Sequence, residues 1–147
     1  MSSTTSRTEA LRAAGLRRTR PRLAVLAVLD RARAPLSHAE VAEVLASEGL
    51  DRATVYRNLL ALSEAGLARR SDLGDHVWRF ERVGGPAATP HAHPHHVCTG
   101  CGSVACLEEL SVRFAGRGAA LARRGVEIQL RGPCAACAKP GRRAKIA

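Results

Sequence analysis

Aromatic side chains are scarce in this chain of 147 residues. They account for 3% of it, with one Trp, one Tyr and two Phe, so a hydrophobic core has to be built mainly from Leu, Val and Ala. Long apolar runs are absent as well: no segment approaches the roughly 18 apolar residues that span a bilayer. The first 22 residues lack the apolar centre of an export signal. The sequence therefore predicts a cytoplasmic protein without a membrane partner.

Acidic residues and lysines are also few. The chain has 13 acidic residues against 23 basic ones, which gives a formal charge of +10, and only Lys139 and Lys145 are lysines. Arginine binds phosphates and guanine edges through paired hydrogen bonds, which lysine cannot do. This excess of arginine indicates a polyanionic partner, most simply a nucleic acid, whatever the fold.

Capping residues divide the first half of the chain into helices. Ser6, Thr19, Ser37 and Asp51 each stand where a helix N-cap is expected, and Gly or Pro residues follow the predicted ends. The predicted helices cover about 6–14, 20–32, 38–48 and 52–65. Two strand-like segments, 67–71 and 76–81, are joined by a short Gly-containing connection typical of a hairpin. Helices followed by a basic hairpin predict a winged helix-turn-helix over residues 1–82.

The second half begins after a segment of small, uncharged residues, VGGPAATP, which is typical of a linker. We place a hinge at 83–92 and a separate domain at 93–147. This domain is expected to contain strands at 95–98, 104–107 and 126–130, with a helix at 111–124 that two glycines interrupt. The predicted fold class is α+β, in which a small C-terminal α/β domain for dimerisation and metal binding follows the winged helix.

Four cysteines occur as two C-x-x-C pairs, and the members are Cys98, Cys101, Cys134 and Cys137. Each pair forms a tight knuckle that offers two thiolates, and four thiolates complete the tetrahedral shell that Zn²⁺ prefers. A closed site of this kind is structural, so one Zn²⁺ per chain is expected. Redox-active pairs are the alternative, but they need a thioredoxin-like βαβ setting that the pattern lacks. The quartet taken alone would also suit a zinc ribbon.

Several segments together resemble the ferric uptake regulator family. They are RPRLAVLAVL at 20–29, ATVYRNL in the fourth predicted helix, WRFE at 78–81 and HPHHVCTGCG at 93–102. The resemblance covers about residues 11–137. It implies a homodimeric, metal-responsive winged-helix repressor that binds palindromic operators of metal-homeostasis genes. Within the family, the zinc uptake regulators are the most similar group.

The fourth predicted helix carries the candidate DNA contacts. Its first two turns would enter the major groove, as a recognition helix does, and they hold Arg52, Thr54, Tyr56 and Arg57. Arg57 suits a guanine edge, and a packing role is the alternative for Tyr56. Arg20, with the arginines around it, is expected to bind backbone phosphates and to make binding dependent on salt.

A second, regulatory metal site is implied by the resemblance. The family binds its regulatory metal with an acidic or Cys residue and two alternate histidines, which here correspond to Glu81, His93 and His95, and Cys106 takes the place of a further acidic ligand. A set with one thiolate favours Zn²⁺ over iron or manganese. A buried core position is the alternative for Cys106.

Two departures from the family pattern affect this site. Pro35 stands where the family often supplies a histidine, so His38 or His76 would be the possible extra ligands, and solvent exposure is the alternative for His38. Ala92 and Pro94 occupy positions of a third family site, and the chain is short before Cys134. We therefore expect no third metal site and a smaller dimerisation sheet.

The remaining alternatives concern function. An iron-, manganese- or peroxide-sensing member of the same family is one. A metallohydrolase built on the H-x-H cluster is another, but no nucleophile with a base and no further catalytic carboxylates accompany that cluster. The sequence thus predicts a repressor that is not an enzyme and has no small-molecule substrate. Ligands on both sides of the hinge would set the spacing of two recognition helices in the dimer.

Overall fold

The computed structural model describes residues 3–84, 94–107, 109–120 and 127–138. The chain divides into two units, Met1–Ala88 and Thr89–Ala147, which are described separately below. Within the described residues, no helix is long and apolar enough to cross a membrane. Most of the predicted hinge, together with His93 and the tail from Lys139 onward, lies outside the described residues.

Four α-helices form the body of the first unit: α1 (Ser3–Ala13), α2 (Arg20–Arg31), α3 (His38–Leu45) and α4 (Arg52–Glu64), with a 3₁₀ turn η1 (Ala46–Glu48) after α3. The Thr19 side chain caps α2, and Asp51 caps α4. Ser37 and Glu40 form a reciprocal capping box at the start of α3. These three caps confirm the predicted helix starts. The cap predicted at Ser6 is wrong, because α1 begins at Ser3 and Ser6 lies inside it.

A three-stranded antiparallel sheet, ordered β1-β3-β2, completes the first unit. Its strands are β1 (Leu36–Ser37), β2 (Ala68–Asp72) and β3 (Trp78–Arg82). β2 and β3 form the wing that the sequence predicted. β3 starts at Trp78 rather than at His76, because His76 adopts a positive φ of 59° in the connecting turn. The short β1 was not predicted; it pairs with β3 through Leu36–Phe80 and Ser37–Arg79.

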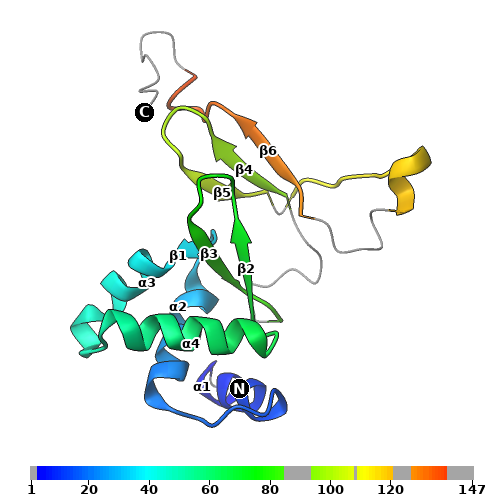
Figure 1. The fold of residues 1–147 in the computed structure, drawn as a ribbon. Helices are drawn as coiled ribbons and strands as arrows, with labels where there is room; N and C mark the ends of the chain where they lie inside the picture. Colours follow the sequence, from blue (N-terminus) through cyan, green and yellow to red (C-terminus); the bar gives the residue numbers. More distant parts are fainter. Residues whose placement is uncertain (1–2, 85–93, 108, 121–126, 139–147) are drawn as a thin grey trace. The chain divides into compact units, whose positions relative to one another are not determined.

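The core of the first unit lies between the helices and this sheet (Figure 1). α4 packs on α2 and α3, and β3 packs on α2. Phe80 brings the wing into the same cluster, because its ring is fully buried. Helical periodicity explains the rest: the apolar stripes of the helices supply aliphatic side chains, among them Val25, Leu29, Val55 and Leu59. α4 is therefore held in place by the body of the unit, through the buried residues Val55, Leu59 and Leu62.

The second unit contains a three-stranded sheet of order β5-β4-β6. The strands are β4 (His95–Cys98), β5 (Val104–Cys106) and β6 (Gln129–Gly132). β4 pairs antiparallel with β5 and parallel with β6. The predicted α+β fold class, a winged helix followed by a small domain with a four-cysteine cluster, is thus confirmed.

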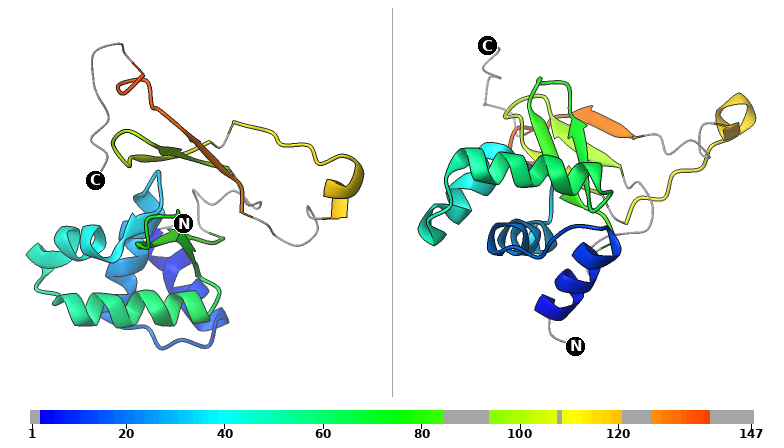
Figure 2. Two further views of the ribbon diagram at one scale, coloured as in Figure 1. Left: turned by 45° about the horizontal axis from the view of Figure 1, so that its top comes forward. Right: turned by 60° about the horizontal axis from the view of Figure 1, so that its bottom comes forward.

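The helix predicted at 111–124 is wrong in its described part. Residues 111–115 are irregular, and only a 3₁₀ turn, η2 (Gly116–Ala120), follows. Both views of Figure 2 show η2 away from the three strands of its own unit. Gly116 has a positive φ of 57°, which ends a right-handed helix, and an exposed segment of this length has no packing partner to stabilise one. The last strand also begins later than predicted, at Gln129.

Candidate metal centres and nucleic-acid interface

The four cysteines of the C-x-x-C pairs lie together in the second unit. Cys98 ends β4 and Cys101 lies in the turn that follows, while Cys134 and Cys137 lie in the turn after β6. Parallel pairing of β4 with β6 places Cys98 beside Gly132 and so brings the two turns to the same end of the sheet. The four sulfur atoms all lie within 4.8 Å of one another. None of the four is in a disulfide.

Backbone amides make the thiol of Cys98 unusually acidic. Its Sγ accepts hydrogen bonds from the amide of Cys134 at 3.2 Å and from that of Gly100 at 3.3 Å. These donors, the Cys134 amide above all, lower the pKa of the Cys98 thiol to about 5. The hydroxyl of Ser103, 3.2 Å from the Cys101 sulfur, lowers the pKa of Cys101 in the same way. Hydrogen bonding thus favours the thiolate form of Cys98 and, in the same direction, that of Cys101.

Cys137 has the opposite environment, because the other sulfurs surround it. Hydrogen bonding to Cys134, followed by Cys101 and Cys98, raises the pKa of Cys137 to about 12. Four sulfurs at this separation would repel one another if all were ionised, and a divalent cation among them removes that repulsion. A soft, tetrahedral ion such as Zn²⁺ therefore fits the donor set.

Gly100 is a part of the first knuckle that the sequence reasoning missed. A Cβ added at residue 100 would lie 3.0 Å from the Cβ of Cys137 and 3.1 Å from its sulfur. The second knuckle therefore packs directly on the backbone of the first. In the sequence, Gly100 is only a spacer between two cysteines, and no local signal marks this approach.

Two of the predicted ligands of the regulatory metal, His95 and Cys106, lie in the described part of the second unit. They are directly opposite each other in the antiparallel β4–β5 pair, and one donor atom from each lies within 4.8 Å of the other. His95 is buried with 1% of its surface exposed, whereas Cys106 is half-buried. Cross-strand pairing thus brings an imidazole and a thiol together, which is a suitable pair for Zn²⁺.

A third polar group near His95 was not predicted. Oε1 of Glu127 lies 3.7 Å from Nδ1 of His95. Glu127 stands two residues before β6, which pairs His95 with Gln129. Parallel pairing between strands separated by about thirty residues has no signature in the sequence, so the approach of this carboxylate could not be foreseen.

Glu81, the predicted acidic ligand, lies on β3 in the first unit. Its side chain is largely buried, and one carboxylate oxygen is 3.5 Å from Nη1 of Arg69 on the paired strand. Arg69 and Glu81 are direct cross-strand partners, so the pairing follows from the register of the wing.

The two possible extra histidine ligands occupy different settings. The imidazole of His76 is 97% exposed at the tip of the wing, 3.8 Å from Asp72. Asp72 accepts hydrogen bonds from the backbone N–H groups of Gly74 and His76, so it shapes the turn. Within the described part of the chain, His76 belongs to no group of three metal-binding side chains.

His38 connects two helices of the first unit. Its Nε2 lies 2.8 Å from the carbonyl oxygen of Arg52, and its ring is 5.2 Å from that of Tyr56. The first residue of α3 therefore contacts the first turns of α4. His38 is half-buried rather than freely exposed, and the partners of its ring belong to α4.

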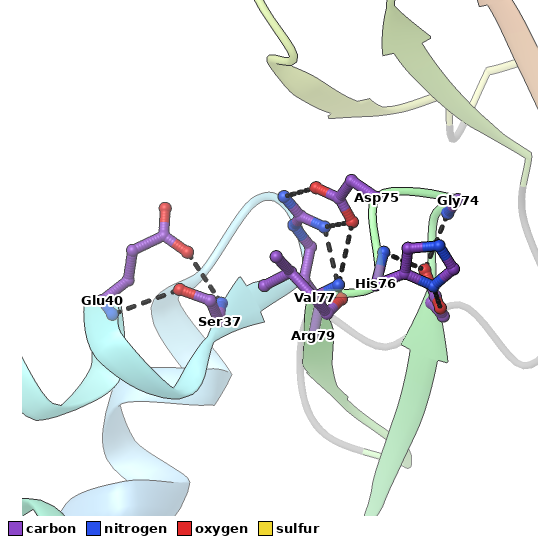
Figure 3. A network of polar contacts seen from close by, with 8 residues as sticks. Ser37, Glu40, Gly74, Asp75, His76, Val77 and Arg79 are labelled. Atoms are coloured by element: carbon purple, nitrogen blue, oxygen red, sulfur yellow. Dashed lines mark hydrogen bonds and ion pairs between the residues drawn. The ribbon is translucent and has the colours of Figure 1, made fainter. Parts of the chain in front are cut away.

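Asp75 and Arg79 form the main ion pair of the wing (Figure 3). Both guanidinium nitrogens of Arg79 donate to the Asp75 carboxylate, at 2.7 and 2.8 Å. This bidentate contact lowers the pKa of Asp75 to about 2 and raises the pKa of Arg79. Arg79 also pairs with Ser37 across the β1–β3 ladder, so the wing tip is tied to the start of α3.

The first turns of α4 present the predicted DNA-contacting side chains. Arg52, Tyr56 and Arg57 are exposed, with Tyr56 at 39%. A chain of hydrogen bonds orders this end: Asp51 accepts the N–H and the hydroxyl of Thr54 at 2.8 and 2.7 Å, and Nη2 of Arg57 donates to Oγ1 of Thr54 at 3.3 Å. The cap of the helix thus also orients Arg57.

Arg20, the predicted phosphate contact, begins α2. Its side chain is exposed, and Nη2 donates to the carbonyl oxygen of Glu48 in η1 at 3.3 Å. Arg22 donates in turn to the carbonyl of Arg17 at 2.9 Å. These backbone contacts fix the guanidinium groups without neutralising them, because a carbonyl oxygen carries no net charge.

Comparison with known proteins places the chain in a family. The model of the "Ferric uptake regulator family" matches residues 13–129, which is most of the chain. The chain belongs to the ferric uptake regulator family. Family membership fits the order of features described above, a winged helix followed by a cysteine-containing domain, and it confirms the resemblance recognised in the sequence.

Individual relatives agree with this membership. Ferric uptake regulation protein 1 of Mycolicibacterium fortuitum is 41% identical over 99 residues, covering 67% of this chain and 58% of that protein. FurA of Mycobacterium tuberculosis is 41% identical over 114 residues, covering 74% of this chain and 71% of the relative. The crystal structure of the Vibrio cholerae ferric uptake regulator is 28% identical with a TM-score of 0.63, covering 86% of this chain and 98% of that one. The chain thus spans less than two thirds of the length of the first of these relatives.

Proposed function

We propose that this member of the ferric uptake regulator family is a metal-dependent transcriptional repressor that binds palindromic operator DNA as a homodimer in the cytoplasm, and that its regulatory metal is Zn²⁺. The observation that supports the proposal is the combination, in one chain, of a capped helix that exposes Arg52, Tyr56 and Arg57 and a cluster of four free thiols. The proposal assigns no catalytic role to the chain.

In the proposed complex, α4 enters the major groove of the operator. Arg57, oriented by Thr54, donates to a guanine edge, and Tyr56 packs on a thymine methyl or reaches a phosphate. Arg20 and Arg52 bind phosphates from the ends of α2 and α4. The formal charge of +10 supports a large electrostatic share in this binding, and affinity should fall steeply with salt.

The four-thiolate cluster is proposed to hold one structural Zn²⁺. Cys98, Cys101, Cys134 and Cys137 would complete its coordination, leaving no position for a substrate or for exchange with solvent. Such a site adds to the folding free energy of the unit that carries it, by about 10–16 kcal/mol in small zinc-binding domains.

The regulatory site is proposed to consist of Glu81, His93, His95 and Cys106, with 83–92 as the hinge between a DNA-binding domain at 1–82 and a dimerisation domain at 93–147. The cross-strand pair of His95 and Cys106 supports this assignment. A bound cation would neutralise the thiolate and the carboxylate. Because the ligands come from both sides of the hinge, filling the site would limit the spacing of the two recognition helices in the dimer.

An iron-responsive repressor is the second candidate. The names of the relatives favour it, since those from Mycolicibacterium fortuitum and Haemophilus ducreyi are ferric uptake regulation proteins. The thiol of Cys106 beside His95 favours Zn²⁺ instead, because iron(II) and manganese(II) prefer harder donors.

The test combines metal analysis with operator binding. The purified dimer is expected to hold one tightly bound Zn²⁺ per chain and to bind its operator only when a second, weaker site is filled. That second site is titrated with Zn²⁺, Fe²⁺, Mn²⁺ and Ni²⁺, and the free concentration needed for operator binding is divided by the intracellular free concentration of the same metal. This ratio should be lowest for Zn²⁺. Operator binding that is unaffected by removal of the second metal would overturn the proposal.

DNA recognition is tested separately with Arg57→Ala. This change should weaken specific operator binding by about 1–3 kcal/mol, since it removes one bidentate base contact. Arg31→Ala is the control, because Arg31 is equally exposed but lies at the far end of α2 from Arg20. Equal losses for both variants would mean that only net charge matters, and α4 would then not be the reading helix.

A further inference from the structure

His95 occupies the centre of the sheet in the second unit. It begins β4, the middle strand, with Cys106 opposite it on β5 and Gln129 beside it on β6. Its backbone N–H donates to the carbonyl of Ile128 at 2.9 Å, so the chain just before β6 is fixed against it. With 1% of its surface exposed, the imidazole depends on protein groups rather than on bulk water for its polar environment.

Glu127 precedes Ile128 and directs a carboxylate toward this imidazole. Oε1 of Glu127 lies 3.7 Å from Nδ1 of His95, an ion-pair distance slightly longer than a hydrogen bond, and the Glu127 side chain keeps 29% of its surface exposed. Nε2 of Gln129 donates to the same oxygen at 3.5 Å, which restrains the carboxylate from the other side. The group therefore faces a defined ring nitrogen of His95.

We propose that Glu127 is a positioning residue for the regulatory metal site, which acts by holding the proton of the His95 imidazole on Nδ1. The negative charge of a carboxylate at this distance favours the tautomer whose N–H faces it, because a carboxylate accepts hydrogen bonds and repels a ring lone pair. The lone pair then lies on Nε2, where it is available to a metal ion. Carboxylate partners of this kind raise the basicity of metal-binding histidines and fix the plane of the ring.

The inference deepens the proposed function, on which its metal-binding part rests. Glu127 itself is not proposed as a ligand, because it faces Nδ1 and its carboxylate does not join His95 and Cys106 in a group of mutually close donor atoms within the described residues.

The first measurement concerns the tautomer and needs no regulatory metal. The full chain is labelled with ¹⁵N-histidine, kept with its tightly bound Zn²⁺, and stripped of weaker metal by a mild chelator. Long-range ¹H–¹⁵N spectra, with His95 assigned from a His95→Gln variant, should show the Nδ1–H tautomer. Glu127→Leu should shift the ring toward the Nε2–H or a mixed form, whereas Glu127→Gln, which keeps a carbonyl acceptor, should retain part of the native signal.

The second measurement concerns affinity. Zn²⁺ affinity at the regulatory site is measured by competition with a chromophoric chelator. In Glu127→Leu this affinity should be about 10- to 100-fold lower than in the unchanged chain. The four-thiolate site should be unaffected. Glu109→Leu, which removes an exposed carboxylate from the same unit, should change neither the tautomer nor the affinity.

The two measurements separate the possible failures. If the unchanged chain binds no second metal, the proposed regulatory site is wrong, while the tautomer still reports on the Glu127–His95 pair. An unchanged tautomer in Glu127→Leu overturns the inference. So does a normal tautomer combined with a lost metal site, because Glu127 would then be a ligand.

Discussion

Cys98 and Cys137 differ in the groups that face their sulfur atoms, although both serve the same proposed ion. Backbone N–H groups point at Cys98, and other sulfurs surround Cys137. A donor N–H stabilises a thiolate, and a neighbouring sulfur with its own negative charge destabilises one. The pKa is accordingly about 5 for Cys98 and about 12 for Cys137.

This difference predicts how many protons leave when Zn²⁺ binds. At pH 7 the metal-free protein already holds Cys98 as a thiolate, whereas Cys137 carries its proton. Loading should therefore release at least one proton and at most three of the four possible. Calorimetry in buffers of different ionisation enthalpy measures this number.

The pH dependence follows with a definite sign. The pKa of Cys98 is depressed, so its thiolate is present above about pH 5 and is lost as the pH falls through that value. Below about pH 5, binding of one Zn²⁺ should therefore release one more proton than at pH 7. The Zn²⁺ affinity should also fall more steeply with decreasing pH in that range. Release of four protons at pH 7 would contradict the assignment.

Gly100 offers a test of knuckle packing. Gly100→Ala places a methyl group 3.0 Å from the Cβ of Cys137, so the second knuckle must shift and the four sulfurs must separate. We expect Zn²⁺ affinity at this site to fall by at least tenfold. The intensity of sulfur-to-metal charge transfer in the Co²⁺-loaded protein should fall with it.

The matched control for this change is Gly132→Ala. Gly132 lies in β6 beside Cys98, and a Cβ there would meet no atom within 4 Å. The Gly132→Ala variant should therefore bind Zn²⁺ with unchanged affinity. Similar losses for both variants would show that the sheet, rather than contact with Cys137, limits the site.

At the scale of elements, α4 depends on its first residues for both stability and orientation. The Asp51 carboxylate accepts hydrogen bonds from the backbone N–H and the hydroxyl of Thr54. The Thr54 hydroxyl oxygen in turn accepts a hydrogen bond from Arg57. The hydroxyl of Thr54 first, and its backbone N–H second, lower the pKa of Asp51 by donating hydrogen bonds to the carboxylate. Both bonds favour the ionised form of the cap. Asp51 therefore both starts the helix and orders the end that is proposed to face DNA.

Two capping variants should separate these roles. Asp51→Ala and Ser37→Ala each remove an N-cap and should each cost about 1 kcal/mol of stability in urea unfolding. Only Asp51→Ala also releases Thr54 and Arg57, so only this variant should weaken operator binding beyond its effect on stability. Fluorescence anisotropy with labelled operator measures the difference. An equal loss in Ser37→Ala would place the effect in α3 instead.

A buried ion network joins three elements of the first unit. Asp30 at the end of α2 accepts Nε of Arg7 from α1 at 2.6 Å and Nε of Arg82 from β3 at 3.1 Å, and all three side chains are nearly inaccessible. Arg82 also donates to the carbonyl oxygens of Leu67 and Val83. A single carboxylate thus fixes the first helix and the end of the wing.

Asp30→Asn should destabilise the first unit strongly. The change leaves two buried guanidinium groups without their counter-charge, which costs on the order of 3–5 kcal/mol. Asp75→Asn is the control, because it breaks an equally short ion pair with Arg79 at an exposed position, where the loss should be about 1 kcal/mol or less. Urea unfolding at pH 7, followed by far-UV circular dichroism, compares them. A small effect in Asp30→Asn would show that water replaces the lost partner.

At the scale of the whole molecule, the two units differ in what holds them together. The first has a continuous cluster of buried aliphatic side chains closed by Phe80. In the described part of the second, the buried apolar residues are Pro94, Val97 and Cys98. A unit with so little buried apolar surface needs another source of stability, and the proposed metal ligation by four thiolates would supply it.

Removal of metal should therefore unfold the units unequally. With a strong chelator under reducing conditions, we expect NMR signals of 94–107 and 127–138 to lose their dispersion. Signals of α1–α4 should remain, and most of the helical circular dichroism with them. Restoring Zn²⁺ should restore the second unit. Dispersed second-unit signals without any bound metal would contradict a structural role for the cluster.

The sequence by itself determined those features whose physical cause is local. Three helix starts were readable because Thr19, Ser37 and Asp51 bond to amides within their own first turn. The cysteine quartet was readable because a knuckle needs a fixed spacing of two ligands. The helix predicted at 111–124 failed for the converse reason: helical periodicity without a packing surface does not make a helix.

Tertiary structure alone decided the features that join distant residues. The approach of Glu127 to His95 depends on a parallel strand pairing, the contact of Gly100 with Cys137 on how two turns meet, and the link from Asp30 to Arg82 on how α2 packs against β3. Each arises from pairing or packing between segments about thirty or more residues apart. No local pattern encodes such a register, because it is set by burial and hydrogen bonding across the folded unit.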